Sequence, residues 1–330
     1  MARSVARTGE RPGFGPAMSA RCQERSRRSG GALQSAPICA TLRPMLLFAS
    51  VALAAFPEEP SITAMDDYGG ASTYIADTSA EVDYVEIGYQ TMVRELGVAI
   101  ANKPMAPAET LGANGFQVGL HNTFAFIRTG SNDGTHPTGW DLASADESPP
   151  IALFIPSLSV RKGLPLSVEL GANAGWVGMT RTGVLGVYGR WAPLEGFRRV
   201  PDVALQVGYS GYIGNDELEV GVLDMSATVG YSLPFGVTEG IHQAVFSPYV
   251  GIGFNQIHAA PRTDLSKTDL EGRVTELSSV QTDPNYLEGM APVQIAGGFR
   301  IQNGDFAATI SGTYSPSLIA TVNVGLGFVY

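Results

Sequence analysis

The sequence predicts an all-β fold: a closed antiparallel β-barrel of about ten strands that crosses a membrane, preceded by one amphipathic helix. Three observations support this prediction. The chain is 44% hydrophobic but only 16% charged, with a mean hydropathy of +0.08, which is apolar for a soluble protein. It contains no run of about 18 apolar residues that could form a membrane-spanning helix. Instead, apolar residues alternate with small and polar ones from Phe116 to Tyr330, and strand counts of eight or twelve are the alternatives.

Residues 1–54 are predicted to be a leader that ends in a signal peptide. A basic stretch precedes the apolar run Met45–Phe56, which contains the sequence Ala52-Leu53-Ala54. This order is typical of a secretory signal, so we expect cleavage after Ala54. Met18 and Met45 are candidate start codons downstream of residue 1, and a buried helix or strand is the alternative interpretation of the apolar run.

The charges and cysteines exclude several function classes. Residues 1–44 hold eight Arg and two Glu, a balance of +6, so the rest of the chain carries 13 basic and 29 acidic residues, a balance of −16. Such an acidic mature chain is not expected to bind nucleic acid. Cys22 and Cys39 both precede the predicted cleavage site. The exported chain would therefore have no disulfide, thiolate metal site or cysteine nucleophile.

Residues 55–109 are predicted to form a periplasmic linker with a helix at 79–102. Thr78 and Glu81 have the spacing of a capping box, and Asn102-Lys103-Pro104 ends the helical pattern. A helix is about 10 Å wide and is not expected to fit a ten-strand lumen filled by side chains. We therefore expect it beneath the barrel or against the membrane interface, since a helix threaded through the lumen would require twelve or more strands. Its apolar stripe is Val82, Val85, Tyr89, Val93, Leu96 and Ile100.

Residues 110–330 are predicted to form the barrel. We expect a turn at Arg161-Lys162-Gly163 between the second and third strands. In the sixth strand, apolar residues change from even to odd positions, which predicts a β-bulge near Gly221–Leu223. The ten expected strands cover residues 115–127, 151–161, 164–177, 182–192, 203–213, 218–233, 246–258, 293–301, 306–314 and 318–330.

Turn residues near the C-terminus predict a register. Asn303-Gly304 is a two-residue type I′ turn signal, and it sets Ile301 opposite Phe306. The following loop, Ser315-Pro316-Ser317, sets Tyr314 opposite Leu318. In both hairpins apolar residues then meet apolar residues, and a slip of one residue would reverse every face.

The lengths of the connections predict the orientation of the barrel. The connections at 128–149 and 259–290 are long, and each has a net charge of −3. An even number of strands places both on the outer side and returns the C-terminus to the periplasm, as in outer-membrane barrels.

The minority face of the strands carries few charges, so those few are candidate functional residues. Gly, Ser, Thr, Asn and Gln dominate this face, which suits a narrow lumen better than open water. Glu169 and Arg190 come nearly opposite each other in the predicted hairpin and are expected to form a cross-strand ion pair. A pore lining that sets ion selectivity is the alternative. The predicted lumen charge cluster consists of Glu169, Arg190, Asp224 and Arg300.

The C-terminal strand resembles the insertion signal of Gram-negative outer-membrane β-barrel proteins. It alternates up to a terminal aromatic residue, and the residues that match the signal are Val324, Leu326, Phe328 and Tyr330. The segment Pro107–Phe116 is also similar to the entry into the first strand of poorly characterised myxobacterial-type barrels. The resemblance implies an outer-membrane location, with membrane lipid and the barrel-insertion machinery as partners. It implies no defined activity.

Three functions fit this architecture: a structural or surface-binding barrel, a small pore or transporter for small or apolar solutes, and a surface hydrolase. We expect the first and predict no enzymatic activity. His136 with Asp133 and Asp141, and His258 near Asp264, are expected at the outer mouth, where omptin proteases use His and Asp residues. Solvated polar loop residues are the better explanation. No cofactor or metal is expected, because no two of the four histidines have metal-binding spacing: His121, His136, His242 and His258.

Overall fold

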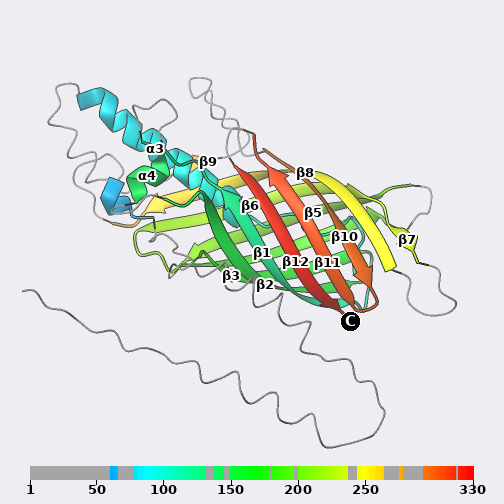
Figure 1. The fold of residues 1–330 in the computed structure, drawn as a ribbon. Helices are drawn as coiled ribbons and strands as arrows, with labels where there is room; N and C mark the ends of the chain where they lie inside the picture. Colours follow the sequence, from blue (N-terminus) through cyan, green and yellow to red (C-terminus); the bar gives the residue numbers. More distant parts are fainter. Residues whose placement is uncertain are drawn as a thin grey trace, which may run out of the picture. The chain divides into compact units, whose positions relative to one another are not determined.

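The computed structural model is a closed antiparallel β-barrel with one long helix at one end (Figure 1). It belongs to one compact unit, Ala55–Tyr330. The predicted leader, its cleavage site and both cysteines lie outside the described residues. The structure describes residues 60–65, 78–130, 137–144, 149–178, 180, 182–196, 200–236, 244–263, 275–277, 293–316 and 319–330.

Ten of the described strands form the barrel wall, which confirms the predicted fold class and strand number. Each pairs with its neighbours in antiparallel register, and two pairings between strands distant in sequence, β1 with β12 and β8 with β10, complete the ring. The wall consists of β1 (Phe116–Phe126), β2 (Ala152–Leu164), β3 (Val168–Trp176), β4 (Gly183–Leu194), β5 (Asp202–Ile213), β6 (Leu218–Gly230), β8 (Ala244–Pro261), β10 (Val293–Asn303), β11 (Phe306–Tyr314) and β12 (Ala320–Val329).

Four short or partly enclosed elements accompany the wall. The strand β7 (Leu233–Phe235) continues the register of β6 along β8, and β9 (Thr275–Leu277) pairs with the far end of β8. The helix α3 (Thr78–Ile100) precedes the barrel, and α4 (Gly139–Ala143) lies in the connection between β1 and β2. No helix among the described residues is long and apolar enough to cross a membrane.

The outer surface of the wall is apolar, as the alternating pattern predicts. Large hydrophobic side chains such as Leu120, Val187 and Ile252 are more than half exposed, although they lie in the middle of strands. A free-standing soluble sheet does not expose a continuous apolar band of this kind, whereas a barrel in lipid requires one. Exposed aromatic residues lie near the two ends of this band: Trp176 and Tyr314 at one end, and Trp191 and Phe328 at the other.

The hairpins keep the predicted faces but differ from the predicted register by two residues. Asn303 pairs with Phe306, so the turn is Gly304-Asp305, with a positive φ of 59° at Gly304. A positive φ at the first central residue alone is the pattern of a type II′ turn, and the predicted type I′ turn is wrong. Tyr314 likewise pairs with Ala320, not with Leu318. A shift of two residues leaves every side chain on its own face, so the hydrophobic pattern cannot detect it.

Two predicted irregularities are also wrong. The strand β2 continues through Arg161-Lys162-Gly163 to Leu164, and the turn falls at residues 165–167, where Leu166 and Ser167 have positive φ angles. The strand β6 pairs with both neighbours in unbroken register, so it contains no β-bulge. Its apolar residues Leu218, Val220 and Val222 simply face inward.

These inward residues belong to an apolar collar that lines one end of the lumen. The collar collects buried apolar residues from several strands at the end where β1 leads into α4: Ala125, Leu153, Ile155, Val184, Leu218, Val220, Val222, Ile257 and Ala259. They form one hydrophobic cluster with α3. An apolar lining needs an apolar occupant, and α3 supplies it.

The end of α3 lies inside the collar, at the barrel end opposite the C-terminus (Figure 1). From Met92 to Ile100 every residue except Arg94 is buried, so the helix is enclosed on all sides and not along one stripe. The prediction that the helix lies beneath the barrel or on the membrane interface is wrong. Only the last turns of α3 enter the lumen and the chain then continues in extended form, so the condition for twelve or more strands, a helix threaded through the lumen, is not met.

Gly97 makes the close approach between α3 and the wall possible. A Cβ atom added to Gly97 would lie 2.6, 2.8 and 2.9 Å from three side-chain carbons of the fully buried Ile257. A Cβ added to Gly211, in β5, would meet nothing within 4 Å. The collar therefore has no room for a side chain at position 97.

We expect Gly97→Val to push α3 out of the collar, because overpacking a filled interior costs about 1–3 kcal/mol. The N-terminal segment should then be cut by protease much faster than in the wild type, while the barrel itself stays resistant. Gly211→Val is the matched control and should leave cleavage unchanged. Equal protection in both variants would contradict the packing described for α3.

Candidate functional site in the barrel lumen

The candidate site is an extended segment, residues 101–110, that crosses the lumen from the end of α3 to the start of β1. Eight of its ten residues are buried, including Asn102, Lys103 and the fully enclosed Ala108. The next residues lead to Phe116, whose backbone exchanges hydrogen bonds with Tyr330 at the opposite end of the barrel. We call residues 101–110 the lumen segment.

Asn102 attaches the start of the lumen segment to the wall. Its Nδ2 donates to the carbonyl oxygen of Val187 at 3.3 Å, and its Oδ1 accepts from Asn173 Nδ2 at 2.8 Å. Small residues make room for it: a Cβ added to Gly186 would lie 2.5 Å from Asn102 Oδ1, and one added to Gly208 would lie 2.6 Å from its Nδ2. The glycines of β4 and β5 thus serve close packing inside the barrel.

Lys103 connects the start of the lumen segment to the end of the helix. Lys103 turns back and its Nζ donates to the carbonyl oxygen of Ala99, in the last turn of α3. Asp224 of β6 lies in the lumen near Lys103 and Asn102 and is 4% exposed. The lumen segment therefore begins with a buried polar junction, just below the apolar collar.

Arg190 holds the middle of the lumen segment. Its Nη2 donates to the carbonyl oxygens of Ala106, at 3.1 Å, and Pro107, and to Thr228 Oγ1 at 3.2 Å. An extended chain inside a barrel has no ladder partner, so its backbone groups need side-chain partners. Pro104 and Pro107 reduce this requirement because proline has no N–H group.

Two carboxylates fix the far end of the lumen segment. Glu195 accepts from Thr110 N at 2.8 Å and from Thr110 Oγ1 at 2.9 Å. Glu109 Oε2 accepts from Ser232 Oγ at 2.7 Å. The segment is therefore attached to the wall at its beginning, middle and end.

The predicted lumen charges all lie inside the barrel, but the ion pair differs from the predicted one. Glu169 is directly opposite Arg190 in the register of β3 and β4. Its carboxylate instead pairs with Arg161 at 3.1 Å, and Arg161 also donates to Gln117. The prediction of a Glu169–Arg190 pair is wrong, because Arg190 is directed to the carbonyls of the lumen segment. The sequence does not indicate a lumen role for Arg161, because Arg161-Lys162-Gly163 has the composition of a turn.

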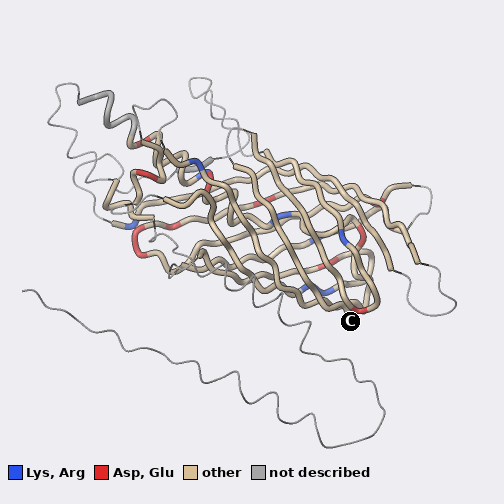
Figure 2. Tube along the Cα trace, viewed as in Figure 1, with Lys and Arg blue, Asp and Glu red and all other residues tan. Residues whose placement is uncertain are grey.

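Arg300, the remaining predicted charge, lies on β10 toward the end of the lumen near the C-terminus. It is 7% exposed, and its Nη2 donates to Gln302 Oε1 at 2.9 Å. Elsewhere the described strands carry few charges (Figure 2), and most of the charged side chains in the wall are buried. Exposed charges are concentrated near the ends, for example the pair Glu219–Arg262.

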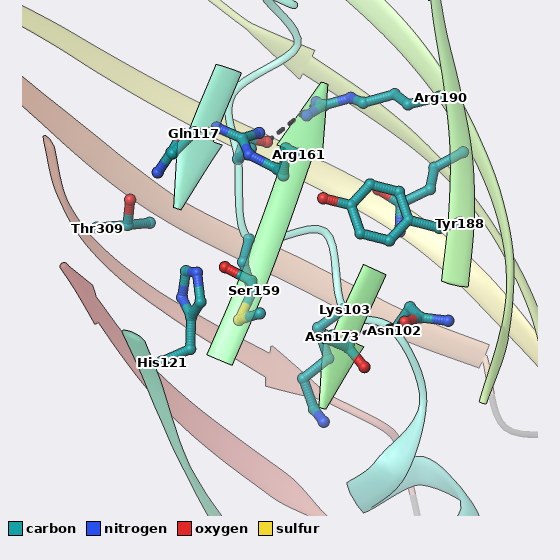
Figure 3. A pocket seen from close by; sticks show the side chains of 13 residues that line it. Asn102, Lys103, Gln117, His121, Ser159, Arg161, Asn173, Tyr188, Arg190 and Thr309 are labelled. Atoms are coloured by element: carbon teal, nitrogen blue, oxygen red, sulfur yellow. Dashed lines mark hydrogen bonds between the residues drawn. The ribbon is translucent and has the colours of Figure 1, made fainter. Parts of the chain in front are cut away.

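Among the described residues, two small cavities and one larger space lie beside the lumen segment. A cavity of about 30 Å³ lies among Asn102 and Lys103 of the lumen segment, Arg161 of β2, and Tyr188 and Arg190 of β4 (Figure 3). A second cavity of about 30 Å³ lies next to Ile100 and Met105. Each has room for about one or two water molecules. A wider space of about 230 Å³ lies at the end near the C-terminus, next to Arg300 and Glu109.

A buried carboxylate connects α3 to the connection between β1 and β2. Glu95 is fully buried, and its Oε2 accepts from the indole nitrogen of Trp140 at 2.7 Å. Its Oε1 lies 3.4 Å from Arg128 Nε. Burial raises the pKa of Glu95 from 4.5 to about 7, although hydrogen bonds from Arg128 and Trp140 and the charge of Arg128 lower it in part. This carboxyl group therefore titrates near neutral pH.

Residues 60–65 lie at the same end of the barrel as α3. Glu217, in the connection between β5 and β6, accepts from Ile62 N at 2.7 Å, from Thr63 N at 3.0 Å and from Ser61 Oγ at 3.1 Å. Ser61 N also donates to the carbonyl oxygen of Ala143 in α4 at 3.0 Å. This carboxylate caps the short helical turn at 62–65 and attaches it to the barrel mouth.

The other predicted residues do not converge on a site among the described residues. His121 faces the lumen, whereas His258 lies on the outer face of β8 and is exposed. His136, His242, Asp133 and Asp264 lie outside the described residues. Within the described part of the chain, no group of three or more His, Cys, Asp and Glu could hold a metal ion. The matches to the insertion signal, Val324, Leu326 and Phe328, face outward on β12, and Tyr330 follows it.

The closed wall, apolar outer band and polar lumen define a β-barrel of the bacterial outer-membrane type. No protein-family model matches the sequence, and no curated protein matches it either.

Among solved structures the chain is similar to several outer-membrane barrels, at a level that carries no argument about function. For the KdgM porin the identity is 9%, the TM-score 0.27 and the coverage 64% of this chain and 98% of that chain. For the transport unit of the autotransporter AIDA-I from Escherichia coli the identity is 8%, the TM-score 0.35 and the coverage 74% of this chain and 98% of that chain. For LpxR from Salmonella typhimurium the identity is 12%, the TM-score 0.28 and the coverage 64% of this chain and 99% of that chain.

We expect Glu169→Gln to lower barrel stability by about 3 kcal/mol, because it leaves the buried Arg161 without a counter-charge. Unfolding by denaturant in detergent would measure the loss. The matched control is Glu219→Gln, whose ion pair with Arg262 is about half exposed and is worth about 0–1 kcal/mol. Equal losses in the two variants would contradict a structural role for the Arg161–Glu169 pair.

We expect the docking of α3 to weaken as the pH rises from about 4.5 to 7. In this range the folded protein keeps the Glu95 proton that the unfolded chain has already released, so raising the pH favours unfolding. Thermal unfolding followed by tryptophan fluorescence should show the Tm falling across this window. Glu95→Gln, which resembles the protonated acid, should remove this component of the pH dependence. An unchanged pH profile in that variant would exclude Glu95 as its source.

Proposed function

We propose that the protein is a structural or surface-binding barrel of the outer membrane, closed by its own N-terminal segment. One observation carries the proposal: the lumen segment is hydrogen-bonded to the wall through Asn102, Arg190 and Glu195 along the length of the lumen. A pore for passive diffusion needs a continuous aqueous path, and the cavities of about 30 Å³ beside this segment do not supply one.

The alternative, a small pore or transporter, requires the lumen segment to leave. If the segment left, the hydrogen bonds from the Arg190 guanidinium to the carbonyl oxygens of Ala106 and Pro107 would be lost. Hydrogen bonds to a charged group contribute about 1.5–3 kcal/mol each, net of the competing hydrogen bonds to water. The closed state is therefore the one that the contacts favour.

The proposal assigns no catalytic activity to the barrel. The surface-hydrolase alternative depends on His136 and His258, and the side chain of His258 points away from the lumen on β8. Cleavage after Ala54 and recognition of the C-terminal strand by the insertion machinery stay predictions, as do membrane lipid as a partner and the lack of nucleic-acid binding.

Single-channel recording in planar bilayers tests the closed lumen. We expect wild-type protein to show no sustained conductance, and the double variant Asn102→Ala, Arg190→Ala to show frequent openings, because it lacks two of the attachments. Leu185→Ala is the matched control, since Leu185 lies on the outer face of β4, and it should behave like the wild type. Stable open channels in the wild type would overturn the proposal in favour of a pore.

A further inference from the structure

The two ends of the barrel differ in the connections that they carry. One end carries the long connections, between β1 and β2 and between β8 and β10, together with the one between β5 and β6. The other end carries the turn at 165–167, the connections between β4 and β5 and between β6 and β8, the turn Gly304-Asp305 and the C-terminus. In outer-membrane barrels the short turns face the periplasm and the long connections face the outside. The first end is therefore the outer mouth.

The N-terminal residues of the described chain lie at this outer mouth. Residues 60–65 are bound to Glu217 and Ala143, both in connections of that end. The helix α3 contacts α4 through Glu95 and Trp140, and a Cβ added to Gly139 would lie 2.0 Å from the Gly88 carbonyl oxygen. Independent contacts thus place both segments with the outer connections.

The first strand nevertheless starts at the periplasmic end. Phe116 pairs with Tyr330 next to the C-terminus, so the chain must pass from the outer mouth to the periplasmic end between residues 100 and 116. A path outside the barrel would expose irregular backbone to lipid, which is prohibitively costly. The chain takes the path inside, as the attachments of Asn102, Arg190 and Glu195 show.

We propose that the barrel displays its own N-terminal segment on the outer surface of the membrane, with residues 60–65 and 78–91 outside and the last turns of α3 and the lumen segment as the connection through the lumen. Together with the connections that contain α4 and Glu217, these residues form the surface that the protein presents to its surroundings. The proposal deepens the surface-binding function, since it names the element that is displayed. It does not depend on closure to ions, because a conducting barrel could still hold its N-terminus outside.

Cysteine labelling in intact cells tests this topology. The only cysteines, Cys22 and Cys39, are replaced by serine, and single cysteines are introduced at the exposed residues Thr63, Ile87, Asp216 and Asp305. A membrane-impermeant maleimide then reports which positions face the medium. Asp216→Cys marks the outer mouth and Asp305→Cys the opposite turn, and labelling after permeabilisation shows the reactivity of each site. Heat-modifiable migration in gels checks that each variant has folded.

We expect Thr63→Cys and Ile87→Cys to be labelled in intact cells to the same extent as Asp216→Cys, and Asp305→Cys only after permeabilisation. If Asp216→Cys is labelled but both N-terminal variants need permeabilisation, the N-terminal segment is periplasmic and the proposal is wrong. If only Asp305→Cys is labelled in intact cells, the barrel is inserted the other way round and the proposal is equally overturned. Bilayer conductance has no bearing on these outcomes, so they separate display from closure.

Discussion

The width of a ten-stranded barrel is the constraint on which the rest of the structure depends. Such a lumen, lined by side chains from every strand, can hold an extended chain but not a helix along its full length. The protein divides the lumen accordingly. An apolar collar around Val222 and Ile257 encloses the last turns of α3, and below it polar side chains surround the lumen segment. An added Cβ at Gly97 would lie 2.6 Å from Ile257, and one at Gly186 would lie 2.5 Å from Asn102, so both positions need glycine for close packing.

The alternating pattern predicted which residues face lipid and which face the lumen, because inward and outward positions differ by one residue and carry opposite polarity. It could not fix the register of the C-terminal hairpins. A shift of two residues pairs Tyr314 with Ala320 in place of Leu318 and leaves both faces intact. The two-residue turn also cannot be located from Asn303-Gly304 alone, since Gly304 can occupy either central position.

The position of α3 was missed, although the sequence contained a signal for it. Leu218, Val220 and Val222 all lie at even positions, which the sequence analysis explains by a β-bulge. In the structure they face inward and need an apolar neighbour.

The role of Arg161 could not be predicted for a different reason. A strand that runs on to Leu164 can be distinguished from one that ends at a Lys-Gly turn only by its partner strand, and Glu169 pairs with Gly163 in that register. The contacts of Arg190 with Ala106 and Pro107 could not be predicted, because the sequence of the lumen segment has no hydrophobic periodicity from which to place it.

The central claim is that the chain passes through the lumen, with residues 60–65 at the end of the barrel opposite the turn Gly304-Asp305. Pulsed electron paramagnetic resonance on spin-label pairs tests it directly in detergent, without any assumption about membrane orientation. One pair joins Thr63 and Asp216, and the other joins Thr63 and Asp305. The structure predicts a short distance for the first pair and a distance of about the barrel length for the second. The reverse order would contradict the threaded arrangement.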